Sequence, residues 1–158
     1  FGEIPGVTDK DYYTNSFHVP VSVKMNAFDK LKEEGQYHAM CDAGHISYVE
    51  LDGDAAKNPE AMAKLLDAMR AYSIGYGAFN VPLDHCEDCH LDGYIPDDIC
   101  PNCGGTHILR MRRITGYLAY LDRFNDGKRA EEKDRVKHDP TPYVKKPVTT
   151  FQLPAELQ

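Results

Sequence analysis

The chain has 158 residues, a formal net charge of −7, 42% hydrophobic residues and 27% charged residues. A chain of this size builds one domain with a core, and it contains no apolar run near the ~18 residues that a membrane span needs. The acidic balance disfavours generic nucleic-acid binding, and no secretory signal is visible, so we expect a soluble cytoplasmic protein. Because the first residue is Phe1 rather than methionine, we expect a fragment of a longer protein.

The first predicted elements are an edge strand and a short helix. Residues 17–23 alternate between apolar and other side chains, which is the period of a half-buried strand. Pro20 within this segment favours an edge or a bulge, because proline lacks the N–H that a central strand needs. Asn26 can cap the helix that follows, which we expect to continue through Glu34 and to end at Gly35 in a left-handed conformation.

A series of strand, helix and strand comes next. Strands are predicted at 45–51 and 78–83. Between them, Asn58 provides a helix cap and Pro59 a first-turn proline, and apolar residues at i, i+3, i+4 and i+7 form one helical face. These apolar residues are Met62, Leu65, Leu66 and Met69. The alternation indicates parallel strands joined by helical crossovers, as in an α/β layer or part of a barrel.

The last predicted elements lie beyond a cluster of cysteines. They are a strand at 108–114, a glycine-centred turn and a charged helix around 129–137. Basic side chains crowd this part of the chain, with acidic side chains between them. That pattern is typical of a solvated surface, and a surface for an anionic ligand is the alternative.

Four of the five cysteines form two C-x-x-C pairs. Each pair places two sulfurs on one tight turn, and two such turns facing each other form a tetrahedral cage of soft ligands that suits zinc. Two disulfides, an iron–sulfur cluster and a redox pair are the competing interpretations, and the two-knuckle form without secretory context favours structural zinc. The predicted ligands are Cys86, Cys89, Cys100 and Cys103. Cys41 is predicted to be a small buried residue rather than a catalytic thiol.

Three short motifs follow the second cysteine pair in a fixed order. They are Arg-x-x-Gly-Tyr-Leu at 113–118, Asn-x-Gly-Lys at 125–128 and Arg-x-x-His at 135–138. Together with the cysteine pairs and the segments 13–20 and 44–50, they resemble the C-terminal region of the anaerobic, class III ribonucleoside-triphosphate reductases, a family of glycyl radical enzymes. The resemblance spans nearly the whole chain, and the joint order of the motifs is far more specific than any one of them.

This resemblance implies an α/β fold with four parts. Residues 1–83 would be the C-terminal part of a glycyl-radical-enzyme α/β barrel, and 84–108 would form the zinc-binding knuckles. Residues 109–138 would hold the glycyl radical loop and a charged helix, followed by a tail at 139–158. The knuckles would brace the base of the loop. Three arginines would anchor the loop to barrel carboxylates or neutralise the thiolate cage: Arg110, Arg112 and Arg113.

The resemblance also implies chemistry and partners. Gly116 would store a glycyl radical, generated by a radical S-adenosylmethionine activase that carries an iron–sulfur cluster. The radical would be used to reduce ribonucleoside triphosphates to deoxyribonucleotides in a homo-oligomeric enzyme, and residues near the substrate pocket would be Asn15, Ser16 and His18. The family's thiyl-forming cysteine is not found here. The chain would therefore be the C-terminal part of a longer reductase or a separately encoded radical-bearing subunit.

Glycine suits a stored radical for a physical reason. A radical at an α-carbon is delocalised when the amide nitrogen and the carbonyl lie in one plane with it, and a Cβ would crowd that arrangement. Taken alone, Gly116 is better explained as a turn residue, for which alanine in an ordinary φ region would cost ~1 kcal/mol or less. The other class of function is a non-enzymatic zinc-ribbon interaction module, and the acidic balance weighs against it.

Overall fold

The computed structural model describes residues 3–5, 8–14, 17–42, 44–51, 55–114 and 116–138. Its helices are α1 (Ala27–His38), α2 (Pro59–Ala71) and α3 (Asp126–Asp134), with short 3-10 turns at Ala55–Lys57 and Leu121–Arg123. Its strands are β1 (Ser47–Glu50), β2 (Gly77–Asn80), β3 (Leu83–Cys86), β4 (Asp92–Gly93), β5 (Ile108–Ile114) and β6 (Tyr117–Tyr120). None of the helices in these ranges is long and apolar enough to cross a membrane.

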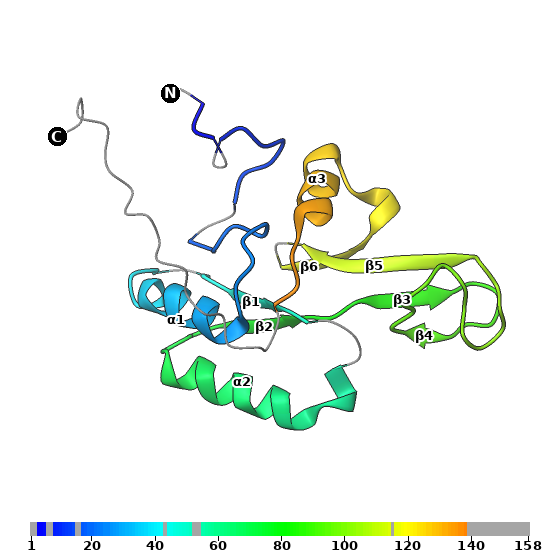
Figure 1. The fold of residues 1–158 in the computed structure, drawn as a ribbon, viewed down its shortest axis with the longest axis horizontal. Helices are drawn as coiled ribbons and strands as arrows, with labels where there is room; N and C mark the ends of the chain where they lie inside the picture. Colours follow the sequence, from blue (N-terminus) through cyan, green and yellow to red (C-terminus); the bar gives the residue numbers. More distant parts are fainter. Residues whose placement is uncertain are drawn as a thin grey trace.

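The molecule has a helical body and an arm that extends from it (Figure 1). The body contains α1, α2 and the pair β1 and β2, whereas the arm consists of β3, β4 and β5 and ends in the two cysteine loops. α3 lies over the inner end of the arm, on the side of β6. The arm therefore reaches from the cysteine loops to the body in a single span of sheet.

The body is built around one parallel strand–helix–strand unit. β1 and β2 are parallel, with Ser47 opposite Gly77 and Glu50 opposite Asn80, and α2 is the crossover between them. The Asn58 side chain caps α2 by accepting a hydrogen bond from the Ala61 N–H at 3.1 Å. The predicted parallel pairing, the helix cap and the order of these elements are confirmed.

The core of the body lies between the two long helices and β1. Its buried side chains come from all three elements, and they are Ala27, Leu31, Val49, Leu65 and Met69. Of the apolar face predicted for α2, Leu65 and Met69 are buried, whereas Leu66 is 55% exposed. The helical period thus predicted the buried face of α2 correctly, but the face that is buried is narrower than predicted.

Within the described ranges, the parallel sheet has only two strands of four residues each. Parallel sheets normally carry more strands and are covered on both faces, because one strand pair buries too little apolar surface. Large apolar side chains are also exposed, among them Tyr13, Phe17, Met40 and Tyr76. The predicted mixed α/β class is present, whereas the described residues form no closed barrel, which stays a prediction.

The strand predicted at 17–23 does not form. These residues adopt turns and irregular backbone. The Val19 N–H donates to the Glu34 carboxylate at 2.9 Å, and the Val23 N–H donates to the Pro20 carbonyl at 2.9 Å. The backbone donors that a sheet would use are therefore taken by a buried side chain and a tight turn.

The end predicted for α1 is also wrong. The helix begins after the Asn26 cap, as expected, but continues to His38 and contains Gly35 in its interior. A Cβ at Gly35 would overlap the Tyr72 carbonyl oxygen at the end of α2. Gly35 is therefore needed for the close approach of two helices and not for a left-handed end.

The three strands of the arm belong to an antiparallel sheet that β6 completes, with the strand order β4-β3-β5-β6. β5 has the bounds predicted for it, and its first residue, Ile108, pairs with Cys86 of β3. The strand predicted at 78–83 is divided between the end of β2 and the start of β3. α3 begins earlier than predicted, because Asn125 caps it by accepting from the Lys128 N–H at 2.9 Å.

The contact at Gly35 gives a first prediction. Gly35→Ala should force α1 away from α2 and lower the free energy of unfolding by about 1–3 kcal/mol. Gly75→Ala is the matched control, since its Cβ would meet only the His38 ring at 3.8 Å. Denaturant unfolding of the purified variants measures the difference. Equal midpoints for the two variants would contradict this account of Gly35.

Candidate functional site

The four paired cysteines converge at the far end of the arm. Their sulfurs all lie within 4.8 Å of one another. The Cys86 and Cys103 sulfurs are 3.6 Å apart, and those of Cys89 and Cys100 are 3.7 Å apart, so each short distance joins the two knuckles. Both pairs are far longer than a disulfide bond of about 2.05 Å, and all five cysteines are free thiols.

These distances fit a metal ion. Four thiolates arranged tetrahedrally at about 2.3 Å from one ion have sulfurs about 3.8 Å apart, close to the separations seen here. Cys86 and Cys100 are buried, and they pack with Ile95 in a small core of their own. The four cysteines are therefore a cluster that could hold a metal ion, as the spacing predicts.

The cluster favours ionised sulfur at one position and resists it at another. A hydrogen bond from Asn102, with help from the Leu91 backbone, lowers the pKa of Cys89 to about 6. The Gly105 N–H lowers the pKa of Cys103, but the neighbouring thiols and burial outweigh it and raise the value to about 12. A thiolate at one cysteine therefore disfavours ionisation of the next cysteine, and a bound cation would remove this electrostatic penalty.

A charged pair joins the two knuckles outside the sulfurs. Asp88 of the first knuckle lies 2.8 Å from the His107 ring beyond the second knuckle. The hydrogen bond with His107 lowers the pKa of Asp88, and the same bond raises the pKa of His107. Gly105 makes room for this pair, because a Cβ there would overlap the Asp88 carboxylate. The cysteines are thus held in register by contacts of the knuckles themselves.

A buried carboxylate, Asp84, connects the knuckles to the strand that leads away from them. It lies on β3 and accepts hydrogen bonds from Arg112 at 2.6 Å, Arg110 at 3.2 Å and the Ile95 N–H at 3.1 Å. Arg110 also pairs with Asp98 at 2.7 Å. The two arginines are thus paired mainly with acids of the arm, and not with the thiolate cage or with carboxylates of the body.

Gly116 lies at the tip of the β5–β6 hairpin. Ile114 pairs with Tyr117, so Gly116 lies in the short connection between the two strands. Gly116 has a φ of +99° and is exposed. An L side chain is strained at that φ, so the expectation that alanine would be accepted in an ordinary φ region is wrong. The turn alone accounts for glycine at this position, and a radical would be a second use of it.

The Asn-x-Gly-Lys motif builds the start of α3 and ties it to the hairpin. Besides the Asn125 cap, the ammonium group of Lys128 lies 4.3 Å from the centre of the Tyr117 ring, next to Gly116. A Cβ at Gly127 would come within 3.2 Å of the Asp11 carbonyl oxygen. Each named residue of the motif therefore has a structural part.

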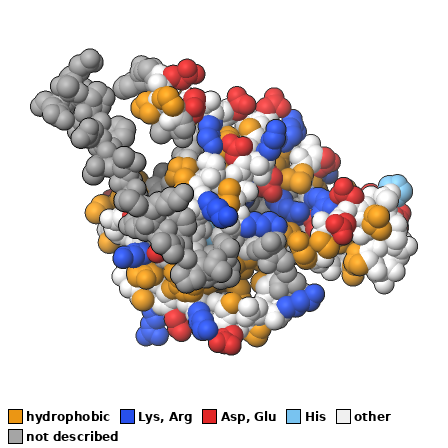
Figure 2. All heavy atoms as spheres, viewed as in Figure 1, with side chains coloured by type: hydrophobic (Ala, Val, Ile, Leu, Met, Phe, Trp, Pro, Cys, Tyr) orange, Lys and Arg blue, Asp and Glu red, His pale blue; other side chains and the backbone are white. Residues whose placement is uncertain are grey.

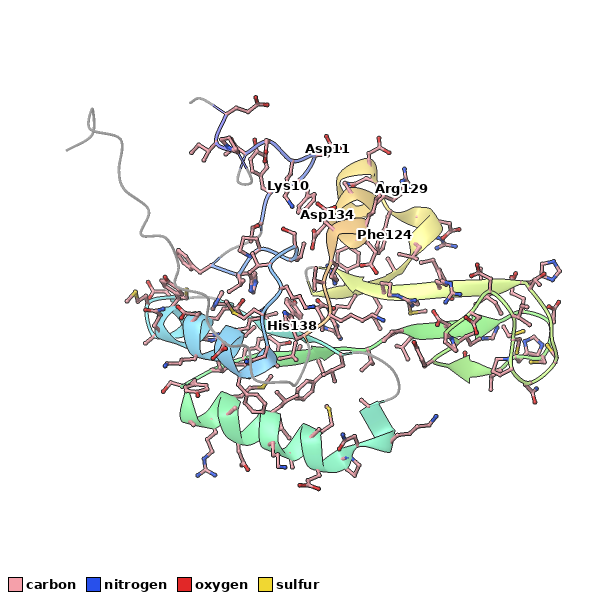
Figure 3. The ribbon with its side chains drawn as sticks, viewed as in Figure 1. Lys10, Asp11, Phe124, Arg129, Asp134 and His138 are labelled. Atoms are coloured by element: carbon pink, nitrogen blue, oxygen red, sulfur yellow. The ribbon has the colours of Figure 1, made fainter. Side chains whose placement is uncertain are left out.

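The segment around Lys10 crosses α3 and is fixed to its other end. Lys10 and Tyr12 donate to the Asp134 carboxylate at 3.0 and 2.9 Å, and Lys10 also donates to Ser22 at 2.9 Å. Figure 3 shows Lys10 and Asp11 beside α3, with Asp134 next to them and Arg129 and Phe124 on the opposite side of the helix. The N-terminal segment and α3 therefore form one packed unit beside the hairpin.

The Arg-x-x-His motif attaches this unit to β1. The Arg135 guanidinium contacts Glu50 at 3.1 Å, Glu131 at 2.8 Å and the Arg113 carbonyl at 3.1 Å. The His138 ring accepts a hydrogen bond from the Glu50 N–H at 2.8 Å, and the backbone N–H of His138 donates to the Glu50 carbonyl at 3.0 Å. Burial lowers the pKa of His138 to about 4, so the ring is neutral and can accept.

A cavity of about 250 Å³ with both charged and apolar lining residues lies between body and arm, at the carboxyl ends of β1 and β2. Figure 2 shows Lys and Arg side chains gathered across this middle region of the surface. The acidic and basic residues that line it are Glu50, Arg110, Arg112, Arg113, Glu132, Arg135 and Lys137. Arg110, Arg112 and Arg135 are paired with carboxylates, so three of the basic residues at the cavity belong to ion pairs within the chain.

The predicted substrate residues are only partly visible. Asn15 and Ser16 lie outside the described residues, as does the predicted tail at 139–158. His18 is described, and its ring stacks on the His45 ring with centroids 4.9 Å apart and lies 3.7 Å from the Glu34 carboxylate. Burial raises the pKa of Glu34, but the His18 hydrogen bond and the Lys30 charge outweigh it and lower the value to about 2.

Sequence reasoning missed several residues that position this site. They are Glu34, Tyr48, Glu50 and Asp84. Tyr48 and Glu50 lie in the segment 44–50 that contributed to the family resemblance, but no spacing rule gave them a role. Glu34 and Asp84 had no local signal, because only the folded chain shows what surrounds their carboxylates. Cys41 is half-buried and stands apart from the cysteine cluster.

Comparisons with known proteins agree on one family. The family model for anaerobic ribonucleoside-triphosphate reductase matches residues 1–138. The anaerobic ribonucleoside-triphosphate reductase of Salmonella typhimurium is 40% identical over 147 residues, covering 87% of this chain and 20% of the relative. That of phage T4 is 38% identical over 147 residues and is covered to 24%. The chain thus spans about a fifth of the length of these relatives.

Solved structures give the same answer for the fold. An anaerobic ribonucleotide reductase structure matches with a TM-score of 0.64 and 27% identity, covering 77% of this chain and 19% of that one. The Thermotoga maritima anaerobic ribonucleotide reductase with MES in the active site matches with a TM-score of 0.55 and 27% identity, covering 68% and 17%. Sequence, motif order and fold therefore agree that the chain belongs to the anaerobic ribonucleoside-triphosphate reductase family.

Proposed function

We propose that the chain is the radical-bearing C-terminal part of an anaerobic ribonucleoside-triphosphate reductase, and that Gly116 stores the glycyl radical used to reduce ribonucleotides to deoxyribonucleotides. The observation that carries the proposal is the place of Gly116. In a chain of this family, it lies at the tip of the hairpin whose first strand starts beside the four-cysteine cluster. The relatives bear the name of this reductase, and the proposal extends their activity to the assembly that contains this chain.

The hairpin tip suits a hydrogen-atom store. Loss of one α-hydrogen leaves a carbon that is most stable when flat between its amide and its carbonyl, and glycine has no Cβ to resist flattening. Gly116 is exposed in the described chain, which is compatible with access by a separate activase of the radical S-adenosylmethionine type. In the assembled enzyme, the stored radical would pass to a cysteine that lies elsewhere in the reductase and acts on the ribose.

The cysteine cluster would hold zinc in a structural role. Four sulfur ligands close the coordination sphere of a zinc ion, which leaves no open position for a substrate or water. Cys86 pairs directly with Ile108, the first residue of β5, and β5 then runs seven residues to the turn. A fixed metal cage would therefore set the register of β5, the strand that leads to the turn with Gly116. A hydrogen-atom transfer between Gly116 and a cysteine sulfur demands such exact placement.

The reductase activity requires more chain than is present here. The two-stranded parallel sheet and the exposed apolar side chains of the body fit an α/β barrel whose other strands come from the rest of the enzyme. We propose that the chain works with that remainder, either covalently joined to it or as a separate subunit, in a homo-oligomeric reductase. A radical S-adenosylmethionine activase with an iron–sulfur cluster and ribonucleoside triphosphates complete the proposed set of partners.

The substrate assignment predicts an effect at His18. His18→Ala in the assembled reductase should lower turnover or raise KM for ribonucleoside triphosphates about tenfold, if the segment that includes Asn15 and Ser16 borders the pocket. Tyr37→Phe is the control, because Tyr37 stacks on Phe17, the neighbour of His18, and phenylalanine keeps that stacking. Steady-state kinetics measure the change, and unchanged kinetics for His18→Ala would return this segment to a structural role.

The metal assignment predicts about one zinc equivalent per chain. Cys86→Ser should release the metal and destabilise the region 83–118, because the cage holds β3 beside β5. Cys41→Ser should keep the full zinc content. Elemental analysis measures the metal, and amide hydrogen exchange measures the loss of protection in the arm. An iron–sulfur absorption band in a freshly purified anaerobic sample would contradict structural zinc.

The radical assignment predicts a break in the chain. A glycyl radical exposed to air cleaves the backbone at its own position, so activated protein should yield a fragment ending near Thr115 by mass spectrometry. Gly116→Ala should remain whole and keep its zinc, although alanine at this φ costs about 1–2 kcal/mol. Gly93→Ala, at a φ of +146° with open space around it, carries a comparable strain and should still be cleaved at Gly116.

Two results would count against that assignment. Wild-type protein that stays intact in air after verified activase treatment would make Gly116 a turn glycine only, as the interaction-module alternative requires. Equal cleavage of wild type and Gly116→Ala would place the reactive position elsewhere.

A further inference from the structure

One side chain of the body lies against the face of Gly116 that has no substituent. An ideal Cβ built on Gly116 comes 3.7 Å from the hydroxyl oxygen of Tyr48, which is ordinary van der Waals contact. Apart from the glycine's chain neighbours, no other atom of the described residues lies within 4 Å of that point. Among the described residues of the body, the hydroxyl group of Tyr48 is therefore the group that faces the unsubstituted side of Gly116.

Tyr48 is held firmly enough to define a position. It is the second residue of β1, opposite Ala78 of β2, and its neighbours Ser47 and Val49 are completely buried. The His18 ring lies beside the phenol with centroids 5.8 Å apart. The backbone that carries Tyr48 is thus part of the best-packed strand of the body.

Arg113 of the hairpin also acts on the phenol of Tyr48. Burial raises the pKa of Tyr48, and the charge of Arg113 and a hydrogen bond with Arg113 work against the rise. The phenol accordingly keeps its proton at neutral pH. Arg113 lies three residues before Gly116 on β5, and its carbonyl accepts from Arg135, which is paired with Glu50 on β1. The hydroxyl group of Tyr48 thus faces the turn of the hairpin, and the charge of Arg113 on the strand acts on the same phenol.

We propose that Tyr48 is a positioning residue for Gly116, whose hydroxyl group closes the side-chain-free face of the glycine and sets the depth of the hairpin tip over β1. The inference rests on the proposed radical at Gly116, which it extends by naming the group next to the radical. A flat glycyl centre has no side chain to fix its depth. A hydroxyl group on a well-packed strand, facing the unsubstituted side of the glycine, supplies that constraint, whereas a phenyl ring without the hydroxyl would leave a wider gap at the glycine.

The test is electron–nuclear double resonance on the assembled, activated reductase in H2O and in D2O. The wild-type radical should show a coupling to one nearby exchangeable proton that vanishes in D2O. Tyr48→Phe should keep its zinc and still form a radical, but without that coupling, and kcat should fall about tenfold with KM unchanged. Tyr37→Phe, which removes a hydroxyl group but keeps the ring stacked on Phe17, should behave as wild type.

The outcomes separate this inference from the function on which it rests. A wild-type radical without an exchangeable coupling, or a coupling that persists in Tyr48→Phe, would overturn the role of Tyr48 and leave the radical at Gly116 intact. A loss of kcat in Tyr48→Phe with an unchanged spectrum would likewise overturn it, because a merely structural role would explain that result. The absence of any radical in activated wild type would overturn the proposed function and this inference with it.

Discussion

The ion pairs of the half-buried Arg135 guanidinium are the interactions on which the arrangement of the body, the hairpin and α3 depends. It joins Glu50 at the end of β1, Glu131 of α3 and the carbonyl of Arg113 on β5. Burial raises the pKa of Glu50, and the charge of Arg135 offsets only part of that rise. Removing one partner from such a buried set leaves an unpaired charge, which costs about 3–5 kcal/mol. The hairpin, α3 and the body are therefore coupled.

The hairpin tip is consequently fixed from two directions. From the arm, the cysteine cluster, Asp84 and the pairing of Cys86 with Ile108 set where β5 begins. At the other end of β5, Arg135 donates to the Arg113 carbonyl, and the hydroxyl group of Tyr48 in the body faces Gly116. The strand between these supports has seven residues, too short and too well paired to bend freely. A glycine at the end of such a strand has a defined position even though it is exposed, and a stored radical needs that property if it is to reach one chosen cysteine.

Local signals in the sequence predicted what local chemistry controls. The cysteine spacing, the Asn58–Pro59 helix start and the bounds of β5 depend on neighbours within a few residues, and the folded chain agrees with them. The strand at 17–23 and the end of α1 failed because a distant carboxylate and a distant carbonyl decide them, and no period records those contacts. The barrel, the radical and the substrate pocket were implied by resemblance. The barrel requires strands from outside the described residues. The radical and the substrate pocket require chemistry that a fold alone does not display.

Electron paramagnetic resonance of the activated, assembled reductase containing α-deuterated glycine tests the central claim most directly. A glycyl radical keeps one α-hydrogen, which splits its spectrum into a doublet, and deuteration at that carbon collapses the doublet. The account predicts a doublet in ordinary protein, its collapse on deuteration and no signal in Gly116→Ala. A spectrum that is unchanged by deuteration, or a doublet that survives in Gly116→Ala, would contradict the storage of a radical at Gly116.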